Sequence, residues 1–122
     1  MKYSIGEIAR LVSLPTSTLR FYEKEGLIPN IKRTEKGIRM FNEQDLIWID
    51  MIRCLKDTGM SIPDIKNIVD LSLLGDETIE TRKNIFLKHK EKIESEMKKL
   101  EIYYEKINNK LNWYENKNNK CN

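Results

Sequence analysis

The chain has 122 residues, of which 39% are apolar and 34% charged, and its formal net charge is +3. This length fits one compact domain with an appended segment, and no apolar run approaches the roughly 20 residues that span a bilayer. The two cysteines, Cys54 and Cys121, are too few for a disulfide framework and lack the spacing of metal ligands. No signal peptide is visible, so we expect an intracellular protein.

A capping-box pattern opens the first predicted helix. In Ser4-Ile5-Gly6-Glu7 the serine hydroxyl can accept from the Glu7 amide while the carboxylate accepts from the Ser4 amide. Apolar residues then recur at helical spacing, which predicts a short helix over residues 4–11.

A second helix is predicted over residues 15–25, because a proline suits the first turn of a helix. We expect it to bury Leu19 and one of the two aromatic residues Phe21 and Tyr22. Gly26 follows, where a left-handed residue ends a helix without strain. Two short helices joined by a tight turn predict a helix-turn-helix, whose second helix lies in the major groove of DNA.

Residues 31–41 are predicted to form a small hairpin, or wing, with a turn at residues 35–37. Basic residues outnumber acidic ones by seven to three between residues 10 and 39, and several of them flank this turn. Such a local basic surface fits the docking of phosphates, although basic stretches are also found on ordinary solvated faces.

A second helical pair is predicted to follow the wing. Asn42 caps a helix over residues 43–58, which Gly59 ends, and a further helix begins at Ser61 and ends before Gly75. The helix-turn-helix (about 4–25), the wing and this pair (about 43–74) share one small core and form a predicted domain over residues 1–74.

A long helix is predicted over residues 76–116, followed by a flexible tail over residues 117–122. The helix keeps apolar residues at heptad spacing over five repeats, although Lys83 and Lys90 interrupt the seam in its first half. A helix of this length with one apolar stripe is expected to dimerise, and the alternative is a lone helix folded back on its own domain. The predicted dimer seam consists of Ile93, Met97, Leu100, Tyr104, Ile107 and Leu111.

Several of these motifs resemble the MerR family of bacterial transcription regulators. The matching runs are Tyr3-Ser4-Ile5-Gly6-Glu7-Ile8-Ala9 and Thr18-Leu19-Arg20-Phe21-Tyr22-Glu23-Lys24-Glu25-Gly26-Leu27-Ile28-Pro29. Residues 33–41 are similar to the wing of that family, and residues 55–62 to its second helix-turn-helix. The resemblance covers nearly the whole chain.

The resemblance implies a mainly α fold, a winged helix-turn-helix followed by an antiparallel coiled coil. It also implies a homodimer that bends and untwists a pseudo-palindromic promoter duplex and so controls RNA polymerase. Such a regulator would act in the cytoplasm, at the nucleoid, as part of a stress response. No nucleophile–base pair, glycine-rich phosphate loop or paired carboxylate site indicates an enzyme, and we expect no cofactor and no membrane partner.

The resemblance assigns DNA contacts to the recognition helix and the wing, where hydroxyls and guanidinium groups reach base edges and phosphates. These residues are Thr16, Ser17, Thr18, Arg20, Tyr22, Arg33, Lys36 and Arg39. Each also fits a plain surface position, and Tyr22 fits a core aromatic. The family commonly has tyrosine where this chain has Phe21 and Ile38, so the wing contact rests mainly on Arg39.

The candidates for a sensing site are the cysteines and the single histidine. Paired cysteines are absent, so no metal site is expected, and His89 fits a helix surface. Cys54 resembles the cysteine of an aldehyde- and electrophile-responsive branch, and Arg53 and Lys56 would favour its thiolate. Packing of Cys54 in the core, beside residues 47 and 51, is the alternative.

Two other functions stay open. One is a regulator that responds to a non-covalent ligand, in a pocket near Trp48, Met51 and Phe86, or to none. The other is a coiled-coil adaptor that uses its N-terminal domain for protein contacts.

Overall fold

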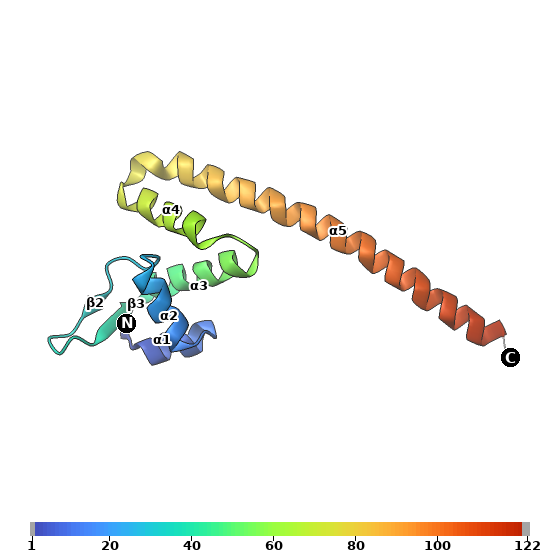
Figure 1. Ribbon diagram of the computed structural model, residues 1–122, viewed down its shortest axis with the longest axis horizontal. Helices are drawn as coiled ribbons and strands as arrows, with labels where there is room; N and C mark the ends of the chain where they lie inside the picture. Colours follow the sequence, from blue (N-terminus) through green and yellow to red (C-terminus); the bar gives the residue numbers. More distant parts are fainter. Residues whose placement is uncertain (1, 121–122) are drawn as a thin grey trace. The chain divides into compact units, whose positions relative to one another are not determined.

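The computed structural model describes residues 2–120, with side chains for residues 2–117. The protein is mainly helical, with an N-terminal helix-turn-helix, a small antiparallel sheet and one long C-terminal helix, which confirms the predicted fold class (Figure 1). It divides into two compact units, Met1–Ile85 and Phe86–Asn122. The elements are β1 (Lys2–Tyr3), α1 (Ile5–Val12), α2 (Thr16–Lys24), β2 (Lys32–Arg33), β3 (Arg39–Asn42), α3 (Glu43–Asp57), α4 (Ile62–Leu73), the 3-10 turn η1 (Asp76–Thr78) and α5 (Ile79–Lys120).

The predicted capping box begins α1. The Glu7 amide donates to Ser4 Oγ at 3.1 Å, and the Ser4 amide donates to Glu7 Oε1 at 3.0 Å. Ser4 lowers the pKa of Glu7, first through the hydrogen bond from its backbone amide and then through its side chain, because both favour the ionised carboxylate. The helix ends at Ser13, whose left-handed backbone (φ 56°) turns the chain toward α2.

Helix α2 buries one of its two aromatic residues and exposes the other. Leu19 and Tyr22 are buried, at 1% and 6% exposure, whereas Phe21 is 46% exposed. Pro15 occupies the N-cap position rather than the first helical turn that the sequence predicted. Gly26 has φ +77°, a left-handed backbone that favours glycine, and the flexible end of the Lys66 side chain lies 2.8 Å from where a Cβ would be.

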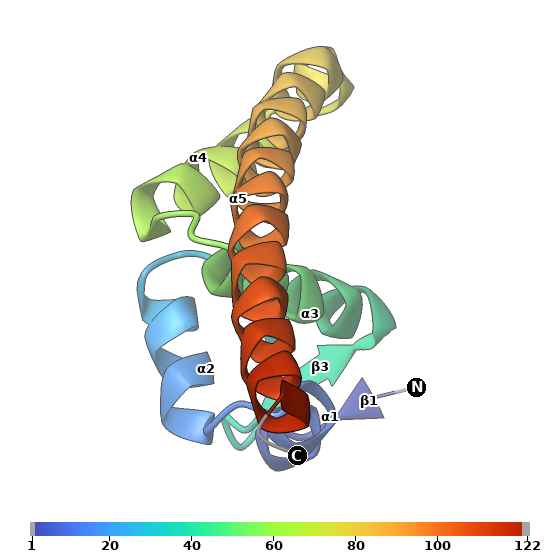
Figure 2. The ribbon, with the colours of Figure 1, turned by 90° about the vertical axis from the view of Figure 1, so that its right-hand side faces the viewer.

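A three-stranded sheet of order β1-β3-β2 underlies the wing. Strand β1 was not predicted, because its two residues carry no alternating pattern of their own. It pairs antiparallel with β3, beside which it lies in Figure 2. Tyr3 lies opposite Phe41. The predicted wing turn is confirmed by the hydrogen bond from the Gly37 amide to the Thr34 carbonyl at 2.8 Å.

Helix α3 begins at the predicted cap and holds the helix-turn-helix in place. Asn42 and Asp45 form a capping box, with hydrogen bonds of 2.8 and 3.0 Å. The indole Nε1 of Trp48 donates to the carbonyl oxygen of Leu27 at 2.6 Å, and Arg53 donates to the carbonyl of Val12. The helix therefore reaches the C-terminal ends of both α1 and α2. The core of this unit is built mainly from Ile8, Val12, Leu19, Leu27, Phe41, Ile49, Ile52, Leu55, Ile65 and Ile68.

The turn between α4 and α5 is tied back to α4. Thr78 Oγ1 donates to the Leu71 carbonyl at 2.6 Å, and the Arg82 guanidinium donates to the Gly75 carbonyl at 3.1 Å. This bonding joins the first turn of α5 to the N-terminal unit, so the division falls within α5 and not near residue 75, where the sequence placed it.

Helix α5 has 42 residues and a length of about 63 Å. It begins at Ile79, after the short turn η1, and runs through Lys120. The sequence placed its end at 116, with a tail from residue 117, so the helix corrects that boundary. The remaining residues of the expected tail, 121–122, include Cys121 and lie outside the described residues.

Candidate nucleic-acid interface

The first turn of α2 presents short hydroxyls beside a guanidinium. Ser17 and Arg20 are exposed, Thr16 and Thr18 are half-buried, and Arg20 Nη1 lies 3.5 Å from Thr16 Oγ1. The N-cap, Pro15, makes no side-chain cap, and this turn contains no acidic residue. The partial positive charge of the helix N-terminus is therefore available to an anion such as a DNA phosphate.

The wing places its basic residues around the turn. Lys36 and Arg33 are exposed, and Arg33 Nη1 donates to the Gly37 carbonyl at 3.0 Å. Strands β2 and β3 set Arg33 directly opposite Arg39. Ile38 is 59% exposed, and as an apolar side chain it offers no donor to a phosphate.

Glu23 on α2 joins the recognition helix to the wing, a role that the sequence did not reveal. Its Oε1 lies 2.6 Å from Arg39 Nε, and its Oε2 lies 3.4 Å from Arg33 Nη2. The residues are separated by 10 and 16 positions in the chain, so no helical or strand spacing links them. Only the fold brings the three side chains together.

Tyr22 serves the core with its ring and reaches the surface with its hydroxyl. Among the described residues, the Tyr22 hydroxyl has no hydrogen-bond partner. Every fully buried side-chain oxygen in that part of the chain has a partner, so this hydroxyl is not fully buried and reaches solvent. Burial of the ring, and then the charge of Asp57, raise the pKa of Tyr22. The hydroxyl is thus a neutral donor at physiological pH.

Cys54 is exposed on α3 and does not pack in the core of this chain. It lies on the same face as Ile47 and Met51, which are 62% and 38% exposed. The two basic neighbours have other partners: Arg53 contacts the Val12 carbonyl and Asp57, and Lys56 Nζ lies 3.4 Å from the Met60 carbonyl. The alternative that Cys54 packs in the core is therefore not seen in the single chain.

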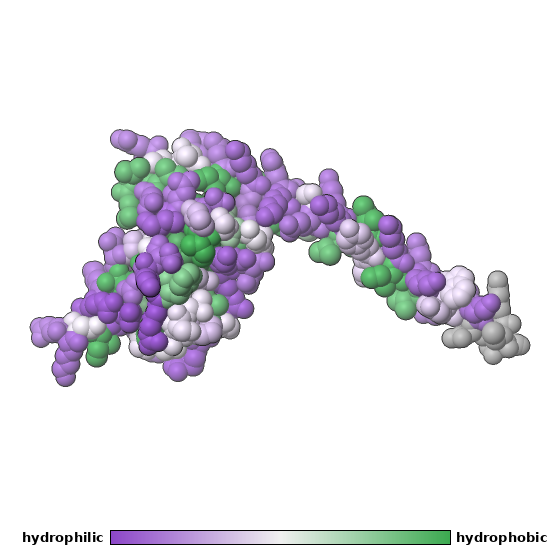
Figure 3. All heavy atoms as spheres, viewed as in Figure 1, coloured by the Kyte–Doolittle hydropathy of each residue, from purple (hydrophilic) through white to green (hydrophobic). Residues whose placement is uncertain are grey.

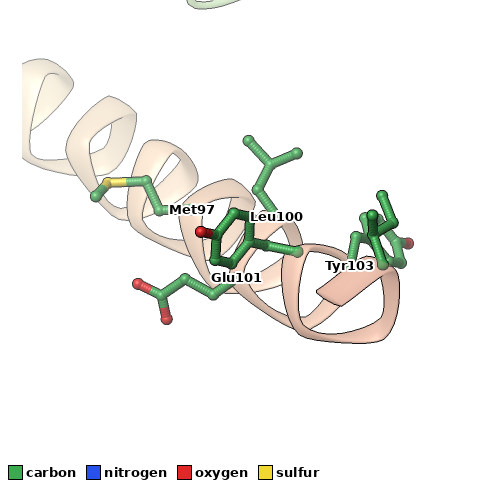
Figure 4. A pocket seen from close by; sticks show the side chains of 6 residues that line it. Met97, Leu100, Glu101 and Tyr103 are labelled. Carbon is green, nitrogen blue, oxygen red and sulfur yellow. The ribbon is translucent and has the colours of Figure 1, made fainter. Parts of the chain in front are cut away.

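The distal part of α5 carries an uncovered apolar stripe. Ile93 is half-buried, and the other five predicted seam residues are each more than half exposed. Figure 3 shows apolar side chains gathered along this half of the helix. A hollow on α5 is lined by Met97, Leu100, Glu101, Tyr103, Tyr104 and Ile107, so it belongs to one helix surface and not to an enclosed cavity (Figure 4).

Between residues 2 and 120, no helix is long and apolar enough to cross a membrane. The described side chains contain no group of three or more His, Cys, Asp or Glu arranged to hold a metal ion.

A family model described as the MerR helix-turn-helix family of regulatory proteins matches residues 3–71. The chain belongs to the MerR family. It is accordingly a DNA-binding transcription regulator and not an enzyme, as the motifs had predicted.

Bacterial transcriptional regulators with a helix-turn-helix match over most of the chain. An uncharacterised transcriptional regulator of Haemophilus influenzae is 38% identical over 115 residues, covering 94% of this chain and 85% of that protein. The transcriptional regulator AdhR of Bacillus subtilis is 39% identical over 90 residues, covering 74% of this chain and 64% of AdhR.

Solved structures of MerR regulators share the fold. The crystal structure of HiNmlR, a MerR family regulator lacking the sensor domain and bound to promoter DNA, is 38% identical, with a TM-score of 0.87; the match covers 94% of this chain and 91% of HiNmlR. A MerR regulator from Bacillus thuringiensis is 40% identical, with a TM-score of 0.82, and covers 91% of this chain and 97% of that one.

Proposed function

We propose that this regulator binds a pseudo-palindromic promoter duplex as a homodimer and distorts it to control initiation by RNA polymerase. The observation that carries the proposal is the link through Glu23 between α2 and the wing arginines. This link holds α2 and the wing together within one unit, and both elements carry basic side chains that can bind DNA phosphates. The structure of HiNmlR, which matches 94% of this chain, is bound to promoter DNA, and this supports DNA binding by this chain.

A second copy of the chain is proposed because one recognition helix is too small for selective binding. Helix α2 has nine residues, so a single unit offers few contacts to base edges. The apolar stripe of α5 supplies a surface that a second α5 would cover, with apolar side chains every seven residues. Two units held at a fixed separation then read two half-sites and set the bend between them, which makes DNA shape part of the recognition.

Selection of DNA tests this proposal. The wild-type protein is incubated with a pool of random duplexes, and the enriched sequence, here called the selected duplex, is footprinted. We expect two inverted half-sites and two chains bound per duplex. We also expect the protein to change the rate of transcription by RNA polymerase from a promoter that carries this site. Weak binding without sequence preference would contradict the proposal and favour the coiled-coil adaptor.

For the input signal, we infer that Cys54 reacts with an aldehyde. Its exposure makes the thiol accessible, and its chain neighbour Arg53 contacts the Val12 carbonyl at the end of α1. A group attached at Cys54 therefore acts on a helix that is bonded to the helix-turn-helix. The similarity to AdhR, at 39% identity, supports the assignment to the same branch.

The chemistry needs no oxidant. The thiolate sulfur adds to the aldehyde carbon, forming the S–C bond while the C=O π pair moves to oxygen. That oxygen takes up one proton, matching the proton lost by the thiol, and the product is a hemithioacetal. The reaction requires a reactive thiolate and access, both of which are properties of sensing cysteines.

Transcription from a promoter that carries the selected duplex, with and without methylglyoxal, tests the inference. We expect the response to disappear in Cys54→Ser and to persist in the matched control Cys121→Ser. An unchanged response in Cys54→Ser would contradict it, and would leave a non-covalent ligand as the input. A protein with no response to methylglyoxal in any form would overturn the aldehyde assignment but not the DNA-binding function.

A further inference from the structure

Strands β2 and β3 create an electrostatic problem in the wing. Their register sets Arg33 directly opposite Arg39, and like charges at opposed positions of a hairpin destabilise it. Glu23, which comes from α2, contacts both guanidinium groups and offsets this repulsion. The Arg39 and Glu23 side chains are 25% and 21% exposed, so this contact is better shielded from solvent than an ordinary surface ion pair.

The contact also has a direction. Arg39 Nε donates a hydrogen bond of 2.6 Å to Glu23 Oε1. Among the described residues, this is the hydrogen bond that the Arg39 guanidinium makes. A guanidinium has five N–H donors in a rigid planar fork, so fixing the Nε edge fixes where the other four donors point. They are left for an acceptor outside the chain.

We propose that Glu23 is a positioning residue for DNA binding, which holds Arg33 and Arg39 together and orients the terminal nitrogens of Arg39 for a phosphate. The inference rests on the proposed function, because it requires the wing to contact DNA. It has an unusual consequence. An acidic residue on a DNA-binding face ordinarily repels phosphates, so its removal should strengthen binding. Removal of Glu23 is instead expected to weaken binding.

The test is a double-mutant cycle on the selected duplex. Glu23→Ala and Arg39→Ala are each expected to raise Kd about tenfold, because the first misplaces and the second removes the charge-assisted contact of Arg39 to a phosphate. The double variant should bind about as well as Arg39→Ala alone, because Glu23 acts through Arg39. Both single variants should also reduce the slope of log K against log salt by about one phosphate contact, a change that a purely structural role would not produce.

Matched controls keep the test decisive. Glu35→Gln removes an exposed acid from the same wing and is expected to leave Kd unchanged or to lower it. Glu23→Gln keeps an oxygen acceptor for Arg39 Nε, so it should bind better than Glu23→Ala and serves as the readout if the alanine variant does not fold. Tighter binding by both Glu23 variants, or effects that add with Arg39→Ala, would overturn the inference.

Failure of the inference and failure of the proposed function give different results. If wild type enriches a duplex but neither Glu23 nor Arg39 variants weaken binding to it, the positioning role is overturned while the regulator function stands. If wild type enriches no duplex, both are overturned.

Discussion

The indole of Trp48 donates a hydrogen bond of 2.6 Å to the carbonyl oxygen of Leu27, across the boundary between α3 and the segment that follows α2. Leu27 is fully buried, so its carbonyl has few other partners to gain if the indole is lost. The contact makes the position of the recognition helix depend on α3, the helix that also carries Cys54.

Replacing Trp48 with Phe tests this coupling. The substitution keeps an aromatic ring but removes the donor, so the free energy of unfolding should fall by about 1–2 kcal/mol. Urea denaturation measures it, and Trp113→Phe, at an exposed position on α5, is the control with little expected effect. Equal stability of Trp48→Phe and wild type would show that this hydrogen bond contributes nothing.

The apolar stripe of α5 is tested by comparing positions on and off the seam. Ile107 and Ile102 are 62% and 52% exposed, but only Ile107 belongs to the heptad seam. Lysine at Ile107 would place a charge in each half of the dimer contact and should raise the dimer dissociation constant at least about tenfold. Sedimentation equilibrium measures this change.

The matched variant Ile102→Lys should leave the dimer intact. If both lysine variants dissociate equally, the contact uses a different face of α5. If neither dissociates, the seam is not the dimer interface.

The Tyr22 hydroxyl is tested by Tyr22→Phe, which keeps the buried ring. Loss of one hydrogen bond to a phosphate should raise Kd for the selected duplex about fivefold, with unfolding at neutral pH nearly unchanged. Phe21→Ala, at the exposed neighbouring position, should alter binding less. Binding by Tyr22→Phe equal to that of wild type would mean that this tyrosine serves only the core.

The raised pKa of Tyr22 predicts a change in stability at alkaline pH. Because the folded protein holds this proton more tightly than the unfolded chain, the contribution is complete below the ordinary value of 10.0 and is lost as pH rises through the folded pKa. Unfolding free energy measured from pH 9 upward should therefore decline less in Tyr22→Phe than in wild type. Parallel declines would show that another group is responsible.

Much of the fold was predictable because it is encoded locally. The capping box at Ser4 and Glu7, the left-handed Gly26 and the turn ending at Gly37 each depend on residues within a few positions of one another. The α5 seam was predictable for a similar reason, since heptad spacing is a property of one helix.

The rest depends on contacts between distant segments. Pairing of β1 with β3 brings together residues about 40 positions apart, and Glu23 meets Arg39 only after the wing has folded against α2. The burial of Tyr22 instead of Phe21, and the exposure of Cys54, were decided by how whole helices pack. Periodicity alone leaves such choices open, because neighbouring positions on a short helix fit it nearly equally well.

The central claim, that two chains bind one duplex and distort it, is tested most directly by energy transfer between dyes at the two ends of the selected duplex. On addition of wild-type protein at two chains per duplex, the transfer should rise as the ends approach, and Ile107→Lys should prevent the rise. A bound duplex whose energy transfer equals that of free DNA, or that saturates with one chain, would contradict the account.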